Sequence, residues 1–454
     1  MRPSLQTIVV LAVALLAGHA AARVSPEQAA RLDDELTPLG AERAGNAEGT
    51  IPAWTGGITE PPPGYDRDHQ HVDPYADDPV LLTITAANMD AHGERLTPGQ
   101  RAMLERHPDS WRMLIYPTRR SASYPDFVYQ AARANALNAD FVATGPGVAQ
   151  GSDITSPFPI PETGVEVVWN HNLRWRGIRV SGLQGRAAVT RGGRYQLLLQ
   201  LQDLSFPYAA QSGSAFKAKF PGVLAAIKLR NVEPALVAGN GSLFIEPIDQ
   251  TADPRKAWAY RRNTRQVLRL PSFAYDFPGA DTNGLRTVDD FWQFNGPTDR
   301  YDWALKGKRE MYVPYNAYRL HSDDVGDRDI VGPKHIEADL ARYELHRVWV
   351  VEGTLKAEAS HRYARRTLYI DEDTWHVLMS DRYDANGQLW RTSEAHLVNF
   401  YNVPVMRSTL DVFYDLLAER YFVEGLNNKR RPLVFDEEGD PREFSPNALR
   451  YFVR

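Results

Sequence analysis

The sequence predicts an α+β protein organised around a large antiparallel β-sheet. Between 343 and 401, four runs rich in aromatic and β-branched residues follow one another, and such residues suit a pleated, half-buried surface. Short polar connections separate the runs, and Asn386-Gly387 tolerates the positive φ angles of a tight hairpin. Helical patterns precede this stretch. The four runs therefore predict a meander of consecutive antiparallel strands.

The two faces of this meander carry different side chains. Strict alternation places Trp375, Val377, Met379 and Tyr383 on one side of their strand, and the hairpin brings Trp390 close to Tyr383. Neither side is uniformly polar, which argues against a fully solvated face. Two interpretations remain open: an aromatic face that lines a ligand concavity, or a sheet covered by helices on both sides.

Residues 1–22 have the pattern of a cleaved export signal. One arginine precedes the apolar run 8–17, and small residues at 20–22 offer a cleavage site. The chain contains no cysteine, which excludes a lipid-attachment cysteine, disulfides and thiolate metal sites. We therefore expect a periplasmic protein whose mature chain begins near Arg23.

Composition excludes some classes of function. The formal net charge of −5 over 454 residues argues against a nucleic-acid-binding protein. An aromatic content of 11% is typical of a chain with a large core. We see no internal repeat and no low-complexity tract.

The rest of the chain divides into two regions that we expect to form one compact unit. Residues 23–160 are a Pro/Gly-rich wrapping region with helices, and residues 161–454 are the sheet domain with a helical lid and a C-terminal extension. Residues 37–79 are too dense in Gly and Pro for regular structure. The expected helices are 26–34, 85–95, 97–107, 165–176 and 410–417, and the further expected strands are 195–202, 223–237, 242–248, 258–260, 265–270 and 311–313.

Short motifs spread over nearly the whole mature chain resemble those of one proteobacterial family, domain of unknown function 1329 (DUF1329). They lie at 37–46, 50–57, 73–77, 158–161, 169–171, 306–311, 314–316 and 369–375. The family is similar to outer-membrane lipoprotein-sorting proteins of the LolA/LolB type. This resemblance implies a strongly curved antiparallel sheet, an incomplete barrel, whose concave face is roofed by helices. It also implies two partners, an inner-membrane transporter of the RND type and an outer-membrane β-rich protein.

Aromatic residues in or beside the predicted strands are the candidates for lining a hydrophobic ligand cavity, although large rings also dominate ordinary cores. They are Trp258, Tyr260, Trp292, Trp303, Trp349, Trp375, Tyr383 and Trp390. Three nearby arginines, Arg261, Arg265 and Arg382, are candidates for contacting an anionic headgroup. The alternative for these arginines is a set of rim salt bridges of small energetic value.

Catalytic and metal-binding patterns are weak by comparison. His69 and His71 lie near Asp68 and Asp73, but their neighbours are typical of a solvated loop rather than of a site with converging ligands. We interpret the acidic pair 289–290 as a helix cap and the acidic run 371–373 as a hairpin turn, rather than as acid–base pairs. No catalytic residue, metal or cofactor is predicted.

The sequence thus favours a periplasmic carrier that shields a lipid or another hydrophobic ligand from water. One alternative is a periplasmic enzyme that acts on an envelope glycan or lipid through carboxylates. The other is a scaffold that transports nothing.

Overall fold

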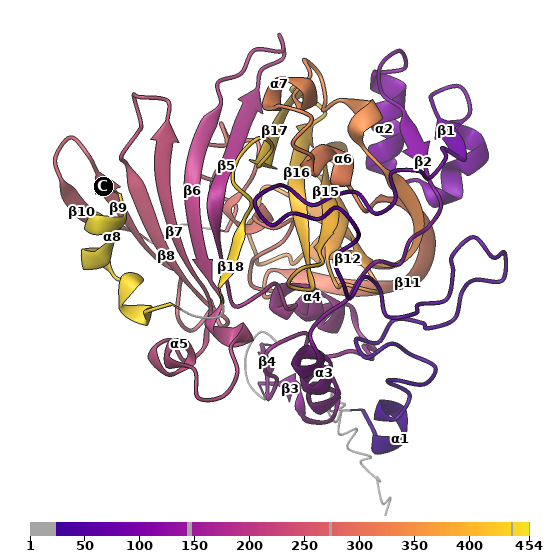
Figure 1. Ribbon diagram of the computed structural model, residues 1–454, viewed down its shortest axis with the longest axis horizontal. Helices are drawn as coiled ribbons and strands as arrows, with labels where there is room; N and C mark the ends of the chain where they lie inside the picture. The colour runs from indigo at the N-terminus through magenta and orange to yellow at the C-terminus, as the bar shows by residue number, and fades with distance from the viewer. Residues whose placement is uncertain (1–23, 143–147, 272–274, 437–438, 454) are drawn as a thin grey trace, which may run out of the picture.

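The computed structural model describes residues 24–142, 148–271, 275–436 and 439–453 (Figure 1). The predicted export signal at 1–22 lies outside these residues. Among the described residues, no helix combines the length and apolar character needed to cross a bilayer.

One open sheet of sixteen strands forms the body of the molecule (Figure 1). Its order is β1-β2-β12-β13-β14-β15-β16-β17-β5-β6-β7-β8-β9-β10, with β11 paired to β12 and β18 to β5. Neighbours are antiparallel except for the contact between β2 and β12. The strands are β1 (Leu82–Ile84), β2 (Met113–Ile115), β5 (Arg179–Val189), β6 (Leu198–Ser205), β7 (Val223–Glu233), β8 (Gly241–Pro247), β9 (Lys256–Arg261), β10 (Gln266–Leu270), β11 (Tyr301–Pro314), β12 (Tyr343–Leu355), β13 (Arg365–Asp371), β14 (Val377–Tyr383), β15 (Leu389–Phe400), β16 (Val405–Asp415), β17 (Arg420–Leu426) and β18 (Val434–Asp436).

The predicted meander is confirmed as β12 to β15, each strand antiparallel to the next. The turn between β14 and β15 contains Asn386 and Gly387, and Gly387 has a φ of 78°. The backbone N–H of Asp384 donates to the carbonyl of Gln388 at 3.0 Å, which closes the hairpin. Glycine is needed here because a side chain disfavours this backbone conformation.

The predicted faces of the meander are wrong, because two β-bulges interrupt the alternation. The register shifts between β13 and β14, so that Val377 pairs with Ile370 while Met379 pairs with Tyr369. Val377 and Met379 therefore lie on opposite faces and in different apolar clusters. A second shift pairs Tyr383 with Leu389 and leaves Trp390 as the extra residue of a bulge.

The helices are few and short. They are α1 (Pro26–Ala29), α2 (Pro98–Arg106), α3 (Asp126–Asn138), α4 (Gly164–Leu173), α5 (Ala215–Lys219), α6 (Tyr318–His321), α7 (Asp327–Ile330) and α8 (Pro446–Phe452). The predicted start of α2 is confirmed, because Thr97 and Gln100 cap it reciprocally. The predicted helix 85–95 is only a 3₁₀ helix at Met89–Arg95.

The prediction of a helix at 410–417 is wrong, because these residues belong mostly to β16. Leu410, Val412 and Tyr414 are buried on one face of this strand, and Phe413 is buried on the other. A strand covered on both faces has a continuous apolar pattern, which periodicity cannot distinguish from a buried helix.

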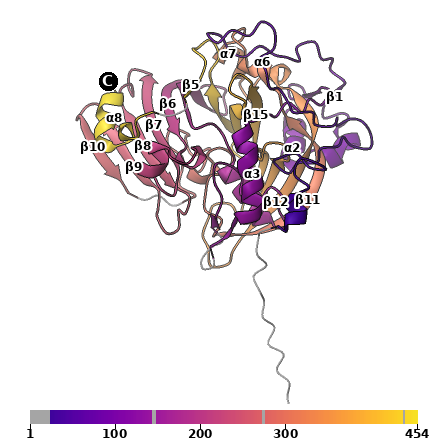
Figure 2. The ribbon, with the colours of Figure 1, turned by 60° about the horizontal axis from the view of Figure 1, so that its bottom comes forward.

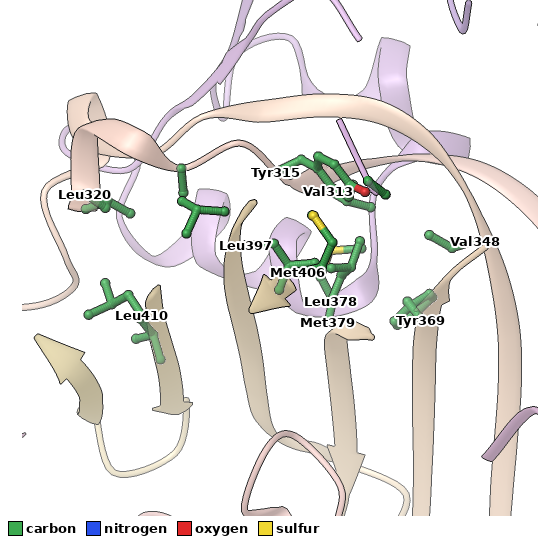
Figure 3. Close-up of a cluster of buried hydrophobic side chains, with 14 of the residues drawn as sticks. Val313, Tyr315, Leu320, Val348, Tyr369, Leu378, Met379, Leu397, Met406 and Leu410 are labelled. Carbon is green, nitrogen blue, oxygen red and sulfur yellow. The ribbon is translucent and has the colours of Figure 1, made fainter. Parts of the chain in front are cut away.

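Each face of the sheet carries its own packing layer. The largest core lies between the β11–β17 region and residues from the N-terminal half, and Figure 3 shows side chains of β11 and β13 to β16 converging there. Helix α3 adds Val128 and Ala132 to this core and stands in front of the middle of the molecule in Figure 2. At the other end, β7 to β10 pack against α5 and α8 (Figure 1). On the face of β13 that is turned away from the largest core, α4 packs Val167 and Val168 against this strand.

Candidate functional site

The largest of the cavities described lies on one face of β7, β8, β9 and β10 and has a volume of about 380 Å³. The strand register aligns Leu229, Ser242 and Ala259 in one row across three strands, and all three border the cavity. Ile227 and Phe244 form a second row beside it. Alternation along each strand thus presents a mainly aliphatic and aromatic floor.

Residues 277–291, here called the roof segment, cover this floor. The N–H of Gly279 donates to the carbonyl of Arg286 at 2.8 Å, and the N–H of Val288 donates to that of Phe277 at 2.9 Å. Leu285 packs against Phe413 and Phe422, which anchors the segment to β16 and β17. Phe277 borders the cavity and is 50% exposed, so the cavity reaches solvent at this side chain.

Charged groups line part of the cavity. Arg255 donates to Glu246 at 2.6 Å, and burial still raises the pKa of this carboxyl. Glu424 faces Arg186 at 3.6 Å and Arg286 at 3.3 Å. The cavity is therefore amphipathic, with apolar rows on the floor and ionic groups at its sides.

A second cavity of about 50 Å³ adjoins the first, and Phe291 borders both. Its walls combine apolar side chains with charged ones, which include Arg174, Arg176, Arg407 and Asp411. Both cavities lie between the roof segment and the same face of the sheet.

The aromatic residues proposed from the sequence do not converge on one cavity. Tyr260 borders the larger cavity and Trp292 the smaller one. Trp258 borders a separate cavity of about 310 Å³ beneath α8, on the opposite face. The other five are Trp303, Trp349 and Trp375, which pack in the apolar cluster under α4, and Tyr383 and Trp390, which lie at the β14–β15 hairpin.

The three arginines proposed as headgroup contacts are also dispersed. Arg261 borders the larger cavity, and Arg265 is exposed between β9 and β10. Arg382 is 1% exposed, and its Nε donates to Asp290 at 2.8 Å. Arg382 therefore forms a buried ion pair inside the protein.

The acidic pair at 289–290 does not cap an α-helix as predicted. It belongs to a single 3₁₀ turn, Val288–Asp290, that is capped by Thr287. Asp289 contacts Arg366 at 2.9 Å and His361 at 3.1 Å. These contacts and the Asp290–Arg382 pair hold the pKa of both carboxyls below the usual range, in spite of burial.

The acidic run 371–373 forms the predicted turn between β13 and β14, but it is buried. His346, Asp371 and Asp373 place potential metal-ligating atoms within 4.8 Å of one another. Both oxygens of Asp373 already accept from Arg120, at 2.6 and 2.9 Å, and His346 faces Glu344 at 3.0 Å. This is the donor set of an ion-pair network more than of a metal centre.

The two histidines considered as metal ligands have different surroundings. The side chain of His69 is 70% exposed and lies 3.4 Å from Asp323. His71 is buried, lies 3.2 Å from a ring nitrogen of His321, and contacts the Asn402 amide oxygen at 2.7 Å. Burial lowers the pKa of His71 to about 4, which keeps this ring neutral at physiological pH.

Glu394 is a buried carboxyl without a charged base beside it among the described residues, and it gives a pH-dependent prediction. The His396 ring lies 3.7 Å away, but burial lowers its pKa to about 3 and keeps it neutral. The oxygens of Glu394 accept from the Tyr343 hydroxyl at 2.8 Å and from Gln100 at 3.4 Å, and burial raises its pKa to about 7. The folded state therefore keeps a proton that the unfolded state releases above about pH 4.5. This carboxyl lowers the free energy of unfolding as pH rises towards 7, by about 3 kcal/mol in total.

We expect Glu394→Gln to abolish that part of the pH dependence. Urea denaturation of both proteins at pH 5 and pH 8 measures it, since the comparison between pH values cancels the constant cost of the altered hydrogen bonds. Equal losses of stability in wild type and variant between the two pH values would contradict the assignment.

Comparison with known proteins supports the family expected from the motifs. An uncharacterized protein of Pseudomonas aeruginosa, PA3922, is 43% identical over 442 residues, which cover 97% of this chain and 96% of that protein. Among solved structures, a DUF1329 family protein from Desulfovibrio piger has a TM-score of 0.41 and 15% identity over 60% of this chain and 92% of its own. The LolA superfamily protein NE2245 from Nitrosomonas europaea has a TM-score of 0.37 and 12% identity over 63% of this chain and 99% of its own.

The family model described as "protein of unknown function (DUF1329)" matches residues 83–450. With this match and the relative of similar length, the chain belongs to the DUF1329 family.

Proposed function

We propose that the protein is a periplasmic carrier that binds a lipid or another hydrophobic ligand in the larger cavity. The observation that supports this is the cavity of about 380 Å³ between the roof segment and β7 to β10, with its two apolar rows. Ligand sites of small molecules have this size and composition. A ligand that buries on the order of 200 Å² of apolar surface there gains about 5 kcal/mol.

The roof segment suggests how the ligand enters and leaves. Phe277 of this segment is both part of the cavity wall and half exposed, so the ligand can pass at this side chain. Transfer in this proposal is passive, so the ligand passes to an acceptor that binds it more tightly. The proposal includes the RND-type transporter and the outer-membrane β-rich protein as partners, as the family resemblance implies.

A substitution that fills the cavity tests the proposal. Ala259 lies on the floor between Ser242 and Leu268. We expect Ala259→Phe to weaken binding of a fluorescent fatty-acid probe at least tenfold, because the new ring occupies the ligand's space. Ala134→Phe on the exposed side of α3 is the matched control and should bind as wild type does.

Mass spectrometry of protein extracted gently from cells provides the second measurement. A lipid or other apolar molecule should copurify with wild type and be depleted in Ala259→Phe. If both proteins bind the probe equally, or if a supplied envelope lipid or glycan is chemically converted, the carrier proposal is wrong.

A further inference from the structure

Three arginines converge on the smaller cavity from two parts of the chain. Arg174 and Arg176 follow the C-terminal end of α4, and Arg407 lies on β16. Arg174 is 7% exposed and Arg176 is 3% exposed. Trp292 of the region just beyond the roof segment lies under Arg176, whose guanidinium carbon is 4.3 Å from the ring centroid.

The hydrogen bonds of these arginines leave donors unused. Arg174 donates through Nη1 to the carbonyl of His171 at 2.5 Å, and Arg176 donates through Nη2 to that of Asn172 at 2.5 Å. Nε of all three arginines and Nη1 of Arg176 have no hydrogen-bond partner within the described parts of the chain. Buried donors of charged groups are normally satisfied, since each unsatisfied one costs about 1–3 kcal/mol or more.

Charge is also unbalanced at this place. Among the described residues, the structure records no carboxylate within 4.0 Å of these three guanidinium groups. Of the acidic residues that line the cavity, Glu424 faces Arg186 and Arg286 instead. Asp411 accepts from Ser408 at 2.8 Å and Gln293 at 3.1 Å, and burial raises its pKa to about 6. Its carboxylate acts electrostatically on Arg174 and Arg407 without a direct ion pair, so one negative charge faces three positive ones.

Burial of these positive charges is unfavourable, and it lowers the pKa values of the three arginines. Burial lowers the pKa of Arg174 to about 9 and that of Arg407 to about 10. Burial, together with the positive charges of Arg174 and Arg407, also lowers the pKa of Arg176 well below its usual value. A guanidinium group nevertheless stays protonated in proteins, so the charges persist and need compensation.

We propose that the smaller cavity is a binding site for an oxyanion, a phosphate or carboxylate group held by Arg174, Arg176 and Arg407. Guanidinium groups match the planar oxygen pairs of such anions, and three of them here surround one space. At about 50 Å³ the cavity exceeds the ~10–15 Å³ that a single water requires. The indole of Trp292 packs against the guanidinium plane of Arg176 and so fixes its orientation. The Nε and Nη1 atoms of Arg176 remain available to donate hydrogen bonds to the anion.

Two sources can supply this group. One is a free small anion, and for that source the site is independent of the carrier function. The other is the head of an amphiphile whose apolar part lies in the larger cavity, and this form rests on the proposed function. The shared wall residue Phe291 and the neighbouring positions Gln184 and Arg186 on β5 bring the two cavities together.

Calorimetric titration of the full mature chain in low-chloride buffer tests the site with three probes: inorganic phosphate, decyl phosphate and neutral decyl glucoside. We expect wild type to bind phosphate or decyl phosphate, and Arg176→Gln to bind the same probe at least tenfold more weakly. Arg176→Lys, which keeps the charge without the planar fork, should fall between them. The exposed Arg450→Gln on α8 is the control and should match wild type.

The probes separate the two sources. Binding of inorganic phosphate that depends on Arg176 indicates a free anion, whereas Arg176-dependent binding of decyl phosphate alone indicates an amphiphile head. Should Arg176→Gln fail to fold, Arg407→Gln must show the same loss. If neither anionic probe binds wild type, or if these variants bind as tightly as wild type, the proposed anion site is wrong. Equal binding of decyl glucoside by all proteins would in that case still support the carrier function.

Discussion

Replacement of Trp375 by alanine is expected to lower the free energy of unfolding by about 3–5 kcal/mol and to leave ligand binding unchanged. Trp375 is fully buried in the turn that enters β14, where its ring stacks on Trp349 at 6.3 Å. Its indole N–H donates to the carbonyl of Leu39 at 3.0 Å, which ties the N-terminal wrapping region to the sheet. The substitution removes both the packing and this tie.

Denaturant melts and probe titrations of Trp375→Ala and Trp390→Ala together check this result. Trp390 is only half buried and donates to Asp415 at 3.1 Å, so its loss should cost less. A Trp375→Ala protein that melts normally and no longer binds the probe would restore the sequence-based hypothesis that this ring contacts the ligand.

Removal of the Asp290 carboxylate is expected to destabilise the protein by about 3–5 kcal/mol. Asp290 is 1% exposed, pairs with Arg382, and accepts from the Tyr363 hydroxyl at 2.9 Å. In Asp290→Ala, Arg382 keeps its charge but loses its counterion in a place without access to water. Breaking such a pair costs far more than exchanging both partners for apolar residues.

The double variant Asp290→Ala/Arg382→Met provides the comparison, and urea denaturation measures wild type, both single variants and the double variant. The double variant should recover a large part of the stability lost in the single variant. If the double variant is as unstable as the sum of both single changes, Arg382 is held by other contacts and the ion pair has little influence on stability.

The sequence predicted best where local chemistry decides the structure. The turn at Asn386-Gly387 follows from backbone sterics alone, and the start of α2 follows from the caps Thr97 and Gln100. β5 was not predicted, because Gly182 and Gly185 interrupt its apolar pattern. The glycine at 182 has a tertiary reason: a Cβ there would lie 2.4 Å from the Leu433 side chain.

The site could be predicted only in part, because bulges and long-range pairing decide which side chains share a face. A shift of one residue at Tyr369/Ile370 is enough to separate Val377 from Met379. The floor residues Leu229 and Phe244 lie in strands that were predicted. Whether such residues line a cavity or belong to a core depends on how the segment above that face of the sheet packs, and this packing is not visible in the strand pattern. The arginines at 174, 176 and 407 carry no local signal, since 230 residues of chain lie between the last two.

The position of β17 has a consequence for the order in which the chain can assemble. β17 pairs with β16 on one side and with β5 on the other, so residues 420–426 join the two halves of the sheet. The half that begins at β5 is synthesised more than two hundred residues earlier, and its β5 edge keeps unpaired backbone groups until β17 arrives. Joining the halves is thus a late, non-local step, and a chain shortened before residue 420 retains two sheets with open edges that invite pairing with other chains.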